Sequence, residues 1–193
     1  MMKPIIAIVL AALILFGAAL GLKSVGEKNA QAYHIQLMQT LLPGSETFTQ
    51  EAYSGEDPII QCVHKGETGF VIETVTNGYA GPITMLVGVS KEGRVTGLVV
   101  RDMEETLGLG RNALTDHVFL AQLLNTKGDV AVGTPGADAF SGATGQTEAD
   151  AEVYIDAISG ATVTSKAIVR CVNAAVGYVT GADVSSGATS WGG

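Results

Sequence analysis

One seven-residue pattern, Asp-x-x-Ser-Gly-Ala-Thr, occurs three times in the chain, at residues 138–144, 156–162 and 183–189. Each copy places serine and threonine hydroxyls beside a glycine, where the backbone can approach a ligand closely. The copies are unequally spaced and the segments between them are dissimilar, so they do not form a solenoid repeat. The pattern therefore indicates a local binding element, and its surroundings decide which copy is used.

The middle copy has a different setting from the other two. It follows a predicted strand at 153–155 and continues directly into an amphipathic helix, whereas the first copy lacks apolar periodicity after it and the third lies next to the C-terminus. The start of a helix offers unpaired N–H groups and a positive dipole end, which suit a phosphate. Gly160 allows the backbone to approach such a ligand, and Thr164 or Ser165 can cap the helix. We expect the middle copy to bind an anion.

The elements that must position this copy form an α+β pattern, with a mainly antiparallel sheet and flanking helices. Runs rich in β-branched residues predict strands, and Lys91-Glu92-Gly93 supplies hairpin-turn chemistry between two of them. Apolar residues at helical spacing predict helices, and Thr115 is placed to cap one of them. The predicted strands cover 68–76, 83–90, 94–102 and 153–155, and a long loop is predicted at 133–150. Two helices are predicted at 27–42 and 114–125. A last helix is predicted from an apolar stripe at Ala167, Ile168, Cys171, Val172, Ala175, Val176 and Val179.

Composition excludes several classes of function. Nineteen acidic against eleven basic residues give a net charge of −8 and a pI near 4.7, so we expect no nucleic-acid binding. A hydrophobic content of 47% is too high for a disordered chain. The three histidines lack metal-ligand spacing, and no Walker loop or serine elbow is present. We therefore predict neither a metal site nor catalytic residues.

The remaining reactive side chains have structural interpretations. Cys171 lies on the apolar stripe of the last helix and is expected in the core, and Cys62 lies in an apolar run. A disulfide between them is left open, since the sequence does not give their separation. Asp102, Glu104 and Glu105 could be interpreted as an acid–base pair, but we expect them to be solvated charges beside a turn.

An uncharged apolar run at residues 5–22 predicts a membrane anchor, because as a helix it would span ~27 Å, close to the hydrocarbon thickness of a bilayer. The alternative is a cleaved signal peptide, whose nearest clear cleavage signal is Ala30-Gln31-Ala32. We expect an anchor at 1–25 in the membrane lipid, an extracytoplasmic domain at 26–181 and a flexible tail at 182–193.

Three ordered elements resemble those of FMN-binding domains. Residues 156–165 resemble their flavinylation motif, and Gly78-Tyr79-Ala80-Gly81-Pro82-Ile83 is similar to their Gly-Tyr-x-Gly-Pro-Ile element. Residues 105–110, Glu-Thr-Leu-Gly-Leu-Gly, resemble the family's Glu-Thr-Pro-Gly-Leu-Gly loop, with Leu107 at the usual proline position. Such domains occur in the G subunit of the Rnf ferredoxin–NAD oxidoreductase and in the C subunit of the sodium-pumping quinone reductase.

The resemblance implies a covalently bound FMN. A separate flavin transferase would esterify the FMN phosphate to Thr162, and we expect one flavin per chain, with none at Thr144 or Thr189. The implied cofactor-binding residues are Tyr79, Glu105, Thr106, Leu109, Gly110, Ser159, Gly160, Ala161, Thr162, Thr164 and Ser165.

The resemblance, together with chain length, favours an electron-transfer subunit of the Rnf complex, whose partners would be its membrane and iron–sulfur subunits. The alternatives are the C subunit of the quinone reductase and a stand-alone membrane-anchored flavoprotein that passes electrons to an external acceptor. A third interpretation is an exported binding domain in which the heptads reflect only loop composition.

Overall fold

The computed structural model describes residues 29–105, 110, 116–133 and 153–181. The chain divides into two compact units, residues 1–37 and 38–193. In the first unit, the described residues 29–37 are helical, and the helix ends at residue 41, close to the end predicted before Pro43. The predicted anchor at 5–22 lies outside the described residues, and none of the described helices has the length and apolarity needed to cross a membrane.

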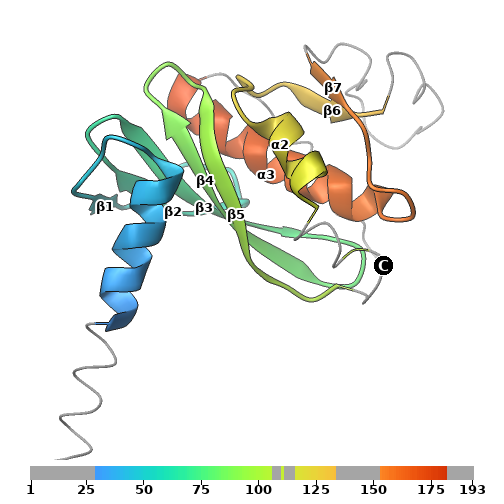
Figure 1. The fold of residues 1–193 in the computed structure, drawn as a ribbon, viewed down its shortest axis with the longest axis horizontal. Coiled ribbons are helices and arrows are strands. Elements are labelled where there is room, and N and C mark those ends of the chain that lie inside the picture. The colour runs from blue at the N-terminus through green and yellow to red at the C-terminus, as the bar shows by residue number, and fades with distance from the viewer. Residues whose placement is uncertain (1–28, 106–109, 111–115, 134–152, 182–193) are drawn as a thin grey trace, which may run out of the picture. The chain divides into compact units, whose positions relative to one another are not determined.

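Five antiparallel strands form the sheet of the second unit (Figure 1). They are joined in chain order, as expected for consecutive hairpins. The strands are β1 (Thr49–Glu51), β2 (Ile60–Lys65), β3 (Gly69–Asn77), β4 (Pro82–Ser90) and β5 (Val95–Met103). This confirms the α+β fold with a mainly antiparallel sheet; β1 and β2 were not predicted.

The β4–β5 turn forms as predicted. Gly93 has φ +75°, and its N–H donates to the Ser90 carbonyl at 2.9 Å. The next bond of the hairpin runs from the Ser90 N–H to the Arg94 carbonyl at 2.8 Å. A positive φ favours glycine, so the local sequence fixes the register of the two long strands.

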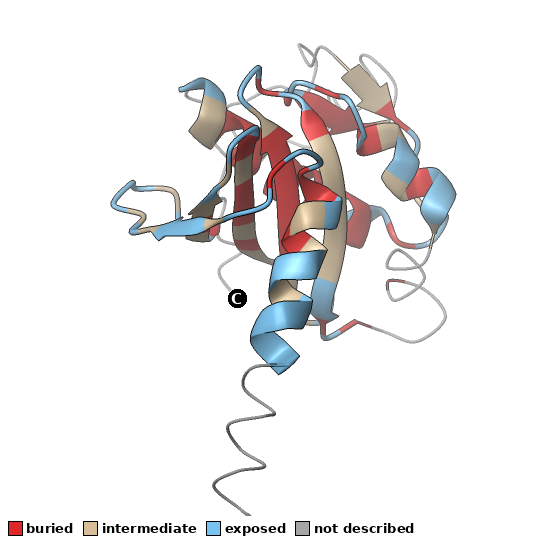
Figure 2. Cartoon of the chain, turned by 60° about the vertical axis from the view of Figure 1, so that its left-hand side comes forward, coloured by how far each residue is buried: buried red, intermediate tan, exposed pale blue. Residues whose placement is uncertain are grey.

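The core lies between this sheet and the long helix α3 (Thr162–Thr180), and the central strands are among the most buried elements (Figure 2). The predicted stripe of α3 is confirmed, with Val179 only partly buried. Cys171 is fully buried, which raises the pKa of its thiol to about 11. Both Cys171 and Cys62 are free thiols in the structure.

The opposite face of the sheet is covered by the last turn of the first helix, at residues 38–41. Gly88 and Gly97 face each other on β4 and β5, and a Cβ on either would collide with Leu41. The Thr96 hydroxyl donates to the Leu41 carbonyl at 2.6 Å. The two glycines therefore let helix backbone lie directly on the sheet.

A smaller layer completes the domain. Helix α2 (His117–Leu123) is followed by β6 (Val130–Val132), which pairs in parallel with β7 (Val153–Ile155). The predicted helix and the strand at 153–155 are confirmed, but the parallel pair was not predicted. Thr115 as the cap of the helix was wrong: Asp116 is the N-cap, because its carboxylate accepts the N–H groups of Val118 and Phe119 at 3.0 Å each. Residues 134–150 of the predicted loop lie outside the described residues.

Candidate functional site

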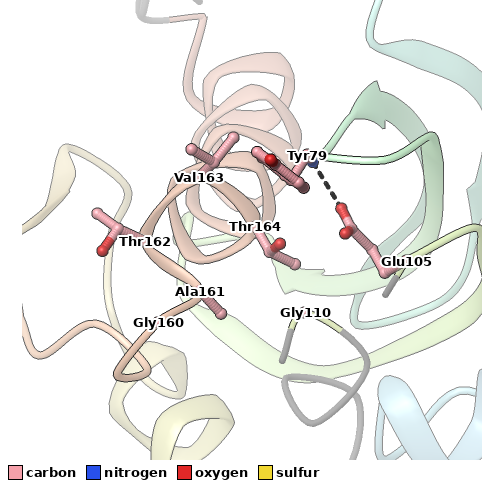
Figure 3. Close-up of a pocket in the computed structure, with 8 residues that line it drawn as sticks. All are labelled: Tyr79, Glu105, Gly110, Gly160, Ala161, Thr162, Val163 and Thr164. Carbon is pink, nitrogen blue, oxygen red and sulfur yellow. Dashed lines mark hydrogen bonds between the residues drawn. The ribbon is translucent and has the colours of Figure 1, made fainter. Parts of the chain in front are cut away.

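A pocket of about 390 Å³ lies at the N-terminus of α3 (Figure 3). This volume is within the range of small-molecule and cofactor sites. Three segments far apart in the sequence form it: the tip of the β3–β4 hairpin, the end of β5 with Gly110, and the turn into α3. Its lining residues are Tyr79, Glu105, Gly110, Gly160, Ala161, Thr162, Val163 and Thr164.

The turn before α3 is held from inside the domain by Ser165. The Ser165 hydroxyl accepts the Ile158 N–H at 3.1 Å and donates to the Ala161 carbonyl at 2.9 Å. The Ala161 N–H closes the turn on the Ile158 carbonyl at 2.9 Å, with Gly160 at φ +76° between them. A left-handed φ favours glycine, so this position of the motif is a conformational requirement.

The start of α3 has no side-chain cap. Its N-cap residue is Ala161, which makes no side-chain hydrogen bond. The expectation that Thr164 or Ser165 caps the helix was wrong, because both lie inside its first turns and are buried. The Ser165 N–H is bonded to the Ala161 carbonyl at 2.9 Å, and the three N–H groups before it precede the intrahelical ladder. These groups, with the positive helix dipole, can bind an anion in the pocket.

Glu105 lies at the other side of the pocket and is buried, with 9% of its surface exposed. Its Oε1 accepts the Tyr79 N–H at 2.6 Å (Figure 3). Its Oε2 is buried and has no hydrogen-bond partner among the described residues. The expected solvation of this carboxylate was wrong, whereas Asp102 and Glu104 are exposed as predicted. A buried acceptor without a donor is costly, so a ligand that donates a hydrogen bond to Oε2 would be stabilised here.

Two glycines make room for this carboxylate. A Cβ on Gly78 would collide with Oε1. A Cβ on Gly110 would lie 2.6 Å from Oε2 and 2.8 Å from the Thr164 hydroxyl. The absence of a side chain at Gly110 therefore leaves a small notch between an acceptor and a hydroxyl.

The structure brings most of the predicted site residues together. Seven of them line the pocket: Tyr79, Glu105, Gly110, Gly160, Ala161, Thr162 and Thr164. Ser165 supports the turn from the core, and Ser159 is an exposed turn residue that is absent from the lining. Thr106 and Leu109 lie outside the described residues, as do the other two copies of the heptad.

Sequence reasoning missed Val163. It lines the pocket, and it is distinguished by being an apolar residue of α3 with 49% of its surface exposed. Tyr79 also lines the pocket and is 76% exposed. The lining thus combines an apolar and an aromatic side chain with polar groups, which is the usual composition of a cofactor site.

The fold and this pocket indicate a cofactor-binding domain. The sequence model of the FMN-binding domain family matches residues 78–177, a range that contains every residue lining the pocket. The chain belongs to the FMN-binding domain family.

Within that family the chain is similar to G subunits of ion-translocating complexes. It is 34% identical over 111 residues to the G subunit of the proton-translocating ferredoxin:NAD(+) oxidoreductase complex of Clostridium ljungdahlii, covering 58% of this chain and 53% of that protein. It is 31% identical to the Na(+)-translocating counterpart of Acetobacterium woodii, over 56% of this chain and 47% of that protein. The chain thus spans about half the length of these two relatives.

Two further similarities extend over more of the chain. The G subunit of the ion-translocating oxidoreductase complex of Pseudomonas aeruginosa is 28% identical over 80% of this chain and 74% of that protein. A crystal structure of the C subunit of the Na(+)-translocating NADH-quinone reductase from Parabacteroides distasonis covers 70% of this chain and 76% of that chain, at 20% identity and a TM-score of 0.49.

Proposed function

We propose that this protein is the electron-carrying G subunit of an Rnf-type ion-translocating ferredoxin–NAD oxidoreductase, with FMN linked through its phosphate to Thr162. The observation that carries the proposal is one pocket with two chemically different sides. Backbone N–H groups at the start of α3 offer donors to an anion, and Glu105 offers an acceptor, Oε2, that has no partner among the residues the structure describes. FMN matches this polarity, because it has an anionic phosphate at one end and a ring N–H at the other.

The position of Thr162 supports the covalent link. Thr162 is the first residue of α3, it is exposed, and it lines the pocket. Its hydroxyl is therefore accessible to a transferase before the ring is bound. In the proposed reaction the phosphoanhydride bond of FAD breaks, a bond forms between the Thr162 oxygen and the FMN phosphorus, AMP leaves, and the hydroxyl proton is released.

The residues of the chain would hold and orient this cofactor. The first N–H groups of α3 bind the phosphodiester, which keeps one negative charge, and Ser165 fixes the turn that aims them. Arg170 donates to the Asn77 carbonyl at 3.1 Å and so ties the β3–β4 hairpin to α3. Once bound, the flavin supplies single-electron transfer, and the protein contributes position and electrostatics. No independent active site is needed for this role.

The place of the protein in a membrane complex is proposed on sequence grounds. The relatives in Clostridium ljungdahlii and Acetobacterium woodii are named as subunits of ferredoxin:NAD(+) oxidoreductase complexes. The apolar run at residues 5–22 supports a single-pass anchor with the flavin domain on the extracytoplasmic side. The proposed partners are the other membrane and iron–sulfur subunits and, during maturation, the flavin transferase.

Replacement of Thr162 tests the proposal. The full chain is co-expressed with a flavin transferase, denatured and examined for flavin fluorescence on a gel and for intact mass. Thr162→Ala should lose the flavin completely, and Thr162→Ser should retain it because the hydroxyl remains. Thr144→Ala and Thr189→Ala are matched controls from the other two heptads and should keep full loading. Stoichiometric flavin on Thr162→Ala, or a flavin peptide containing Thr144 or Thr189, would contradict the single-site assignment.

A further inference from the structure

Glu105 is the one buried carboxyl group among the described residues. Its two oxygens have different surroundings, since Oε1 is bonded to the Tyr79 N–H at 2.6 Å and Oε2 has no partner within the described part of the chain. A carboxylate held by one oxygen cannot turn its second oxygen toward water without breaking that bond. The second oxygen is therefore fixed beside the pocket.

No cation compensates this carboxylate among the described residues. The ion pairs found there join Lys65 to Glu51 and Arg101 to Glu73, both on the sheet. Around Oε2 lie the notch at Gly110 and the hydroxyl of Thr164, which carry no charge. A buried carboxylate disfavours any further negative charge placed close to it.

We propose that Glu105 sets the reduction potential of the bound flavin: Oε2 accepts a hydrogen bond from an N–H at the edge of the ring, and the carboxylate charge opposes the gain of an electron by the ring. This inference rests on the proposed function, because it requires the flavin in this pocket. Oε1 meanwhile holds the hairpin tip that carries Tyr79, so one side chain orients both the ring and the residue beside it.

The direction of the effect follows from electrostatics. Reduction adds an electron to the ring, and repulsion from a carboxylate at hydrogen-bond distance is larger when that carboxylate is buried, as Glu105 is. The oxidised form is favoured relative to the reduced form, so the potential is lowered. An exposed carboxylate nearby has a much smaller effect, since solvent and salt screen it.

Glu105→Gln is the informative variant, because it removes the charge and keeps an oxygen that can accept the Tyr79 N–H. Glu104→Gln is the matched control, with the same change of charge at the adjacent exposed residue. Both chains are loaded with covalent flavin and titrated spectroelectrochemically. At a fixed solution potential, Glu105→Gln should raise the ratio of reduced to oxidised flavin by about tenfold or more, and Glu104→Gln by about twofold or less.

A measurement on the wild type makes the test independent of how the variant folds. Reduced-minus-oxidised infrared spectra of the loaded chain, with glutamate labelled by ¹³C, should contain a glutamate carboxylate band that shifts on reduction. Glu105→Asp, which keeps the charge, should have a potential closer to the wild type than to Glu105→Gln.

The two possible failures are distinguishable. A wild-type chain without flavin would overturn the proposed function and this inference together. A loaded wild type with no labelled carboxylate band, or a Glu105→Gln potential that moves no further than that of Glu104→Gln, would overturn the inference alone.

Discussion

The two ends of α3 differ in how their terminal backbone groups are hydrogen-bonded. At the C-terminus, Gly181 adopts φ +65° and its N–H donates to the Gly177 carbonyl at 2.9 Å. The Thr180 hydroxyl donates to the Val176 carbonyl at 3.0 Å. At the N-terminus, Ala161 provides no side-chain cap, although serine, threonine, aspartate or asparagine is preferred there.

The packing around the two ends differs in the same way. Near the C-terminal end, the Tyr178 ring contacts the rings of Tyr53 and Phe70 edge-on, at centroid distances of 5.9 and 5.8 Å. Near the N-terminal end, Thr162 and Val163 are exposed and border the pocket. The C-terminal end is stabilised by the protein's own groups, whereas the N-terminal end has no side-chain cap. This departure from local helix rules coincides with the site that we propose for the flavin.

The largest expected effect is on the free energy of unfolding and concerns Cys171, in the buried middle of α3. Burial raises the pKa of the Cys171 thiol from an ordinary value of 9.0 to about 11, so the unfolded chain loses its proton at a lower pH than the folded chain. The stabilisation is fully present below pH 9 and is lost as the pH rises to about 11. The free energy of unfolding should fall by about 2 to 3 kcal/mol more in the wild type than in Cys171→Ala over this interval.

Chemical denaturation at a series of pH values measures this difference. Subtracting the Cys171→Ala profile removes the titration of tyrosines, including Tyr178, whose pKa is also raised by burial. Chains with and without flavin should show the same difference between wild type and Cys171→Ala, because Cys171 is buried in the core and does not line the pocket. Parallel profiles for wild type and variant would contradict the burial argument.

The second prediction uses two glycines with similar backbone conformations at the two ends. Gly160 has φ +76° and Gly181 has φ +65°, so alanine at either should lower the free energy of unfolding by about 1 kcal/mol. A Cβ on Gly181 would have no neighbour within 4 Å, which makes it a purely conformational control. Only Gly160→Ala should also reduce flavin loading, since that turn aims the helix N-terminus. Equal flavin loading of the two variants would contradict the claim that only the N-terminal end of α3 takes part in flavin binding.

Local sequence patterns were sufficient to predict the hairpin strands and the turn between the last two of them. The strands β3, β4 and β5 and the turn at Gly93 were predicted to within a few residues, because alternation and turn chemistry act between neighbours. Strand β2 was missed because its register shifts between Ile60 and Cys62, which interrupts alternation. The pairing of β6 with β7 joins segments about 20 residues apart that share no local signal.

The same distinction applies to the site. Thr162 was predicted from a contiguous motif at a strand-to-helix junction. The burial of Glu105 was not, because it depends on a bond to the Tyr79 N–H, 26 residues away, and on the space left by Gly78 and Gly110. Contacts of this kind arise only when three segments meet. The sequence therefore identifies the proposed attachment point more readily than the residues proposed to surround the ring.

The smallest and most discriminating prediction gives the N-terminal end of α3 a cap. In Ala161→Ser, the new hydroxyl can accept one of the N–H groups in the first turn of α3. The flavin-free chain should gain about 0.5 kcal/mol of stability, while flavin loading slows, because the hydroxyl competes with the phosphate for the same donors. Asp116→Ala is the matched control: it removes the existing cap of α2, should cost about 1 kcal/mol, and should leave loading unchanged. Thermal unfolding of the flavin-free chains and the time course of loading measure both quantities.

If Ala161→Ser stabilised the chain and loaded at the wild-type rate, the donors at the start of α3 would not be the phosphate site. The difference between the two ends of the helix would then be one of stability alone.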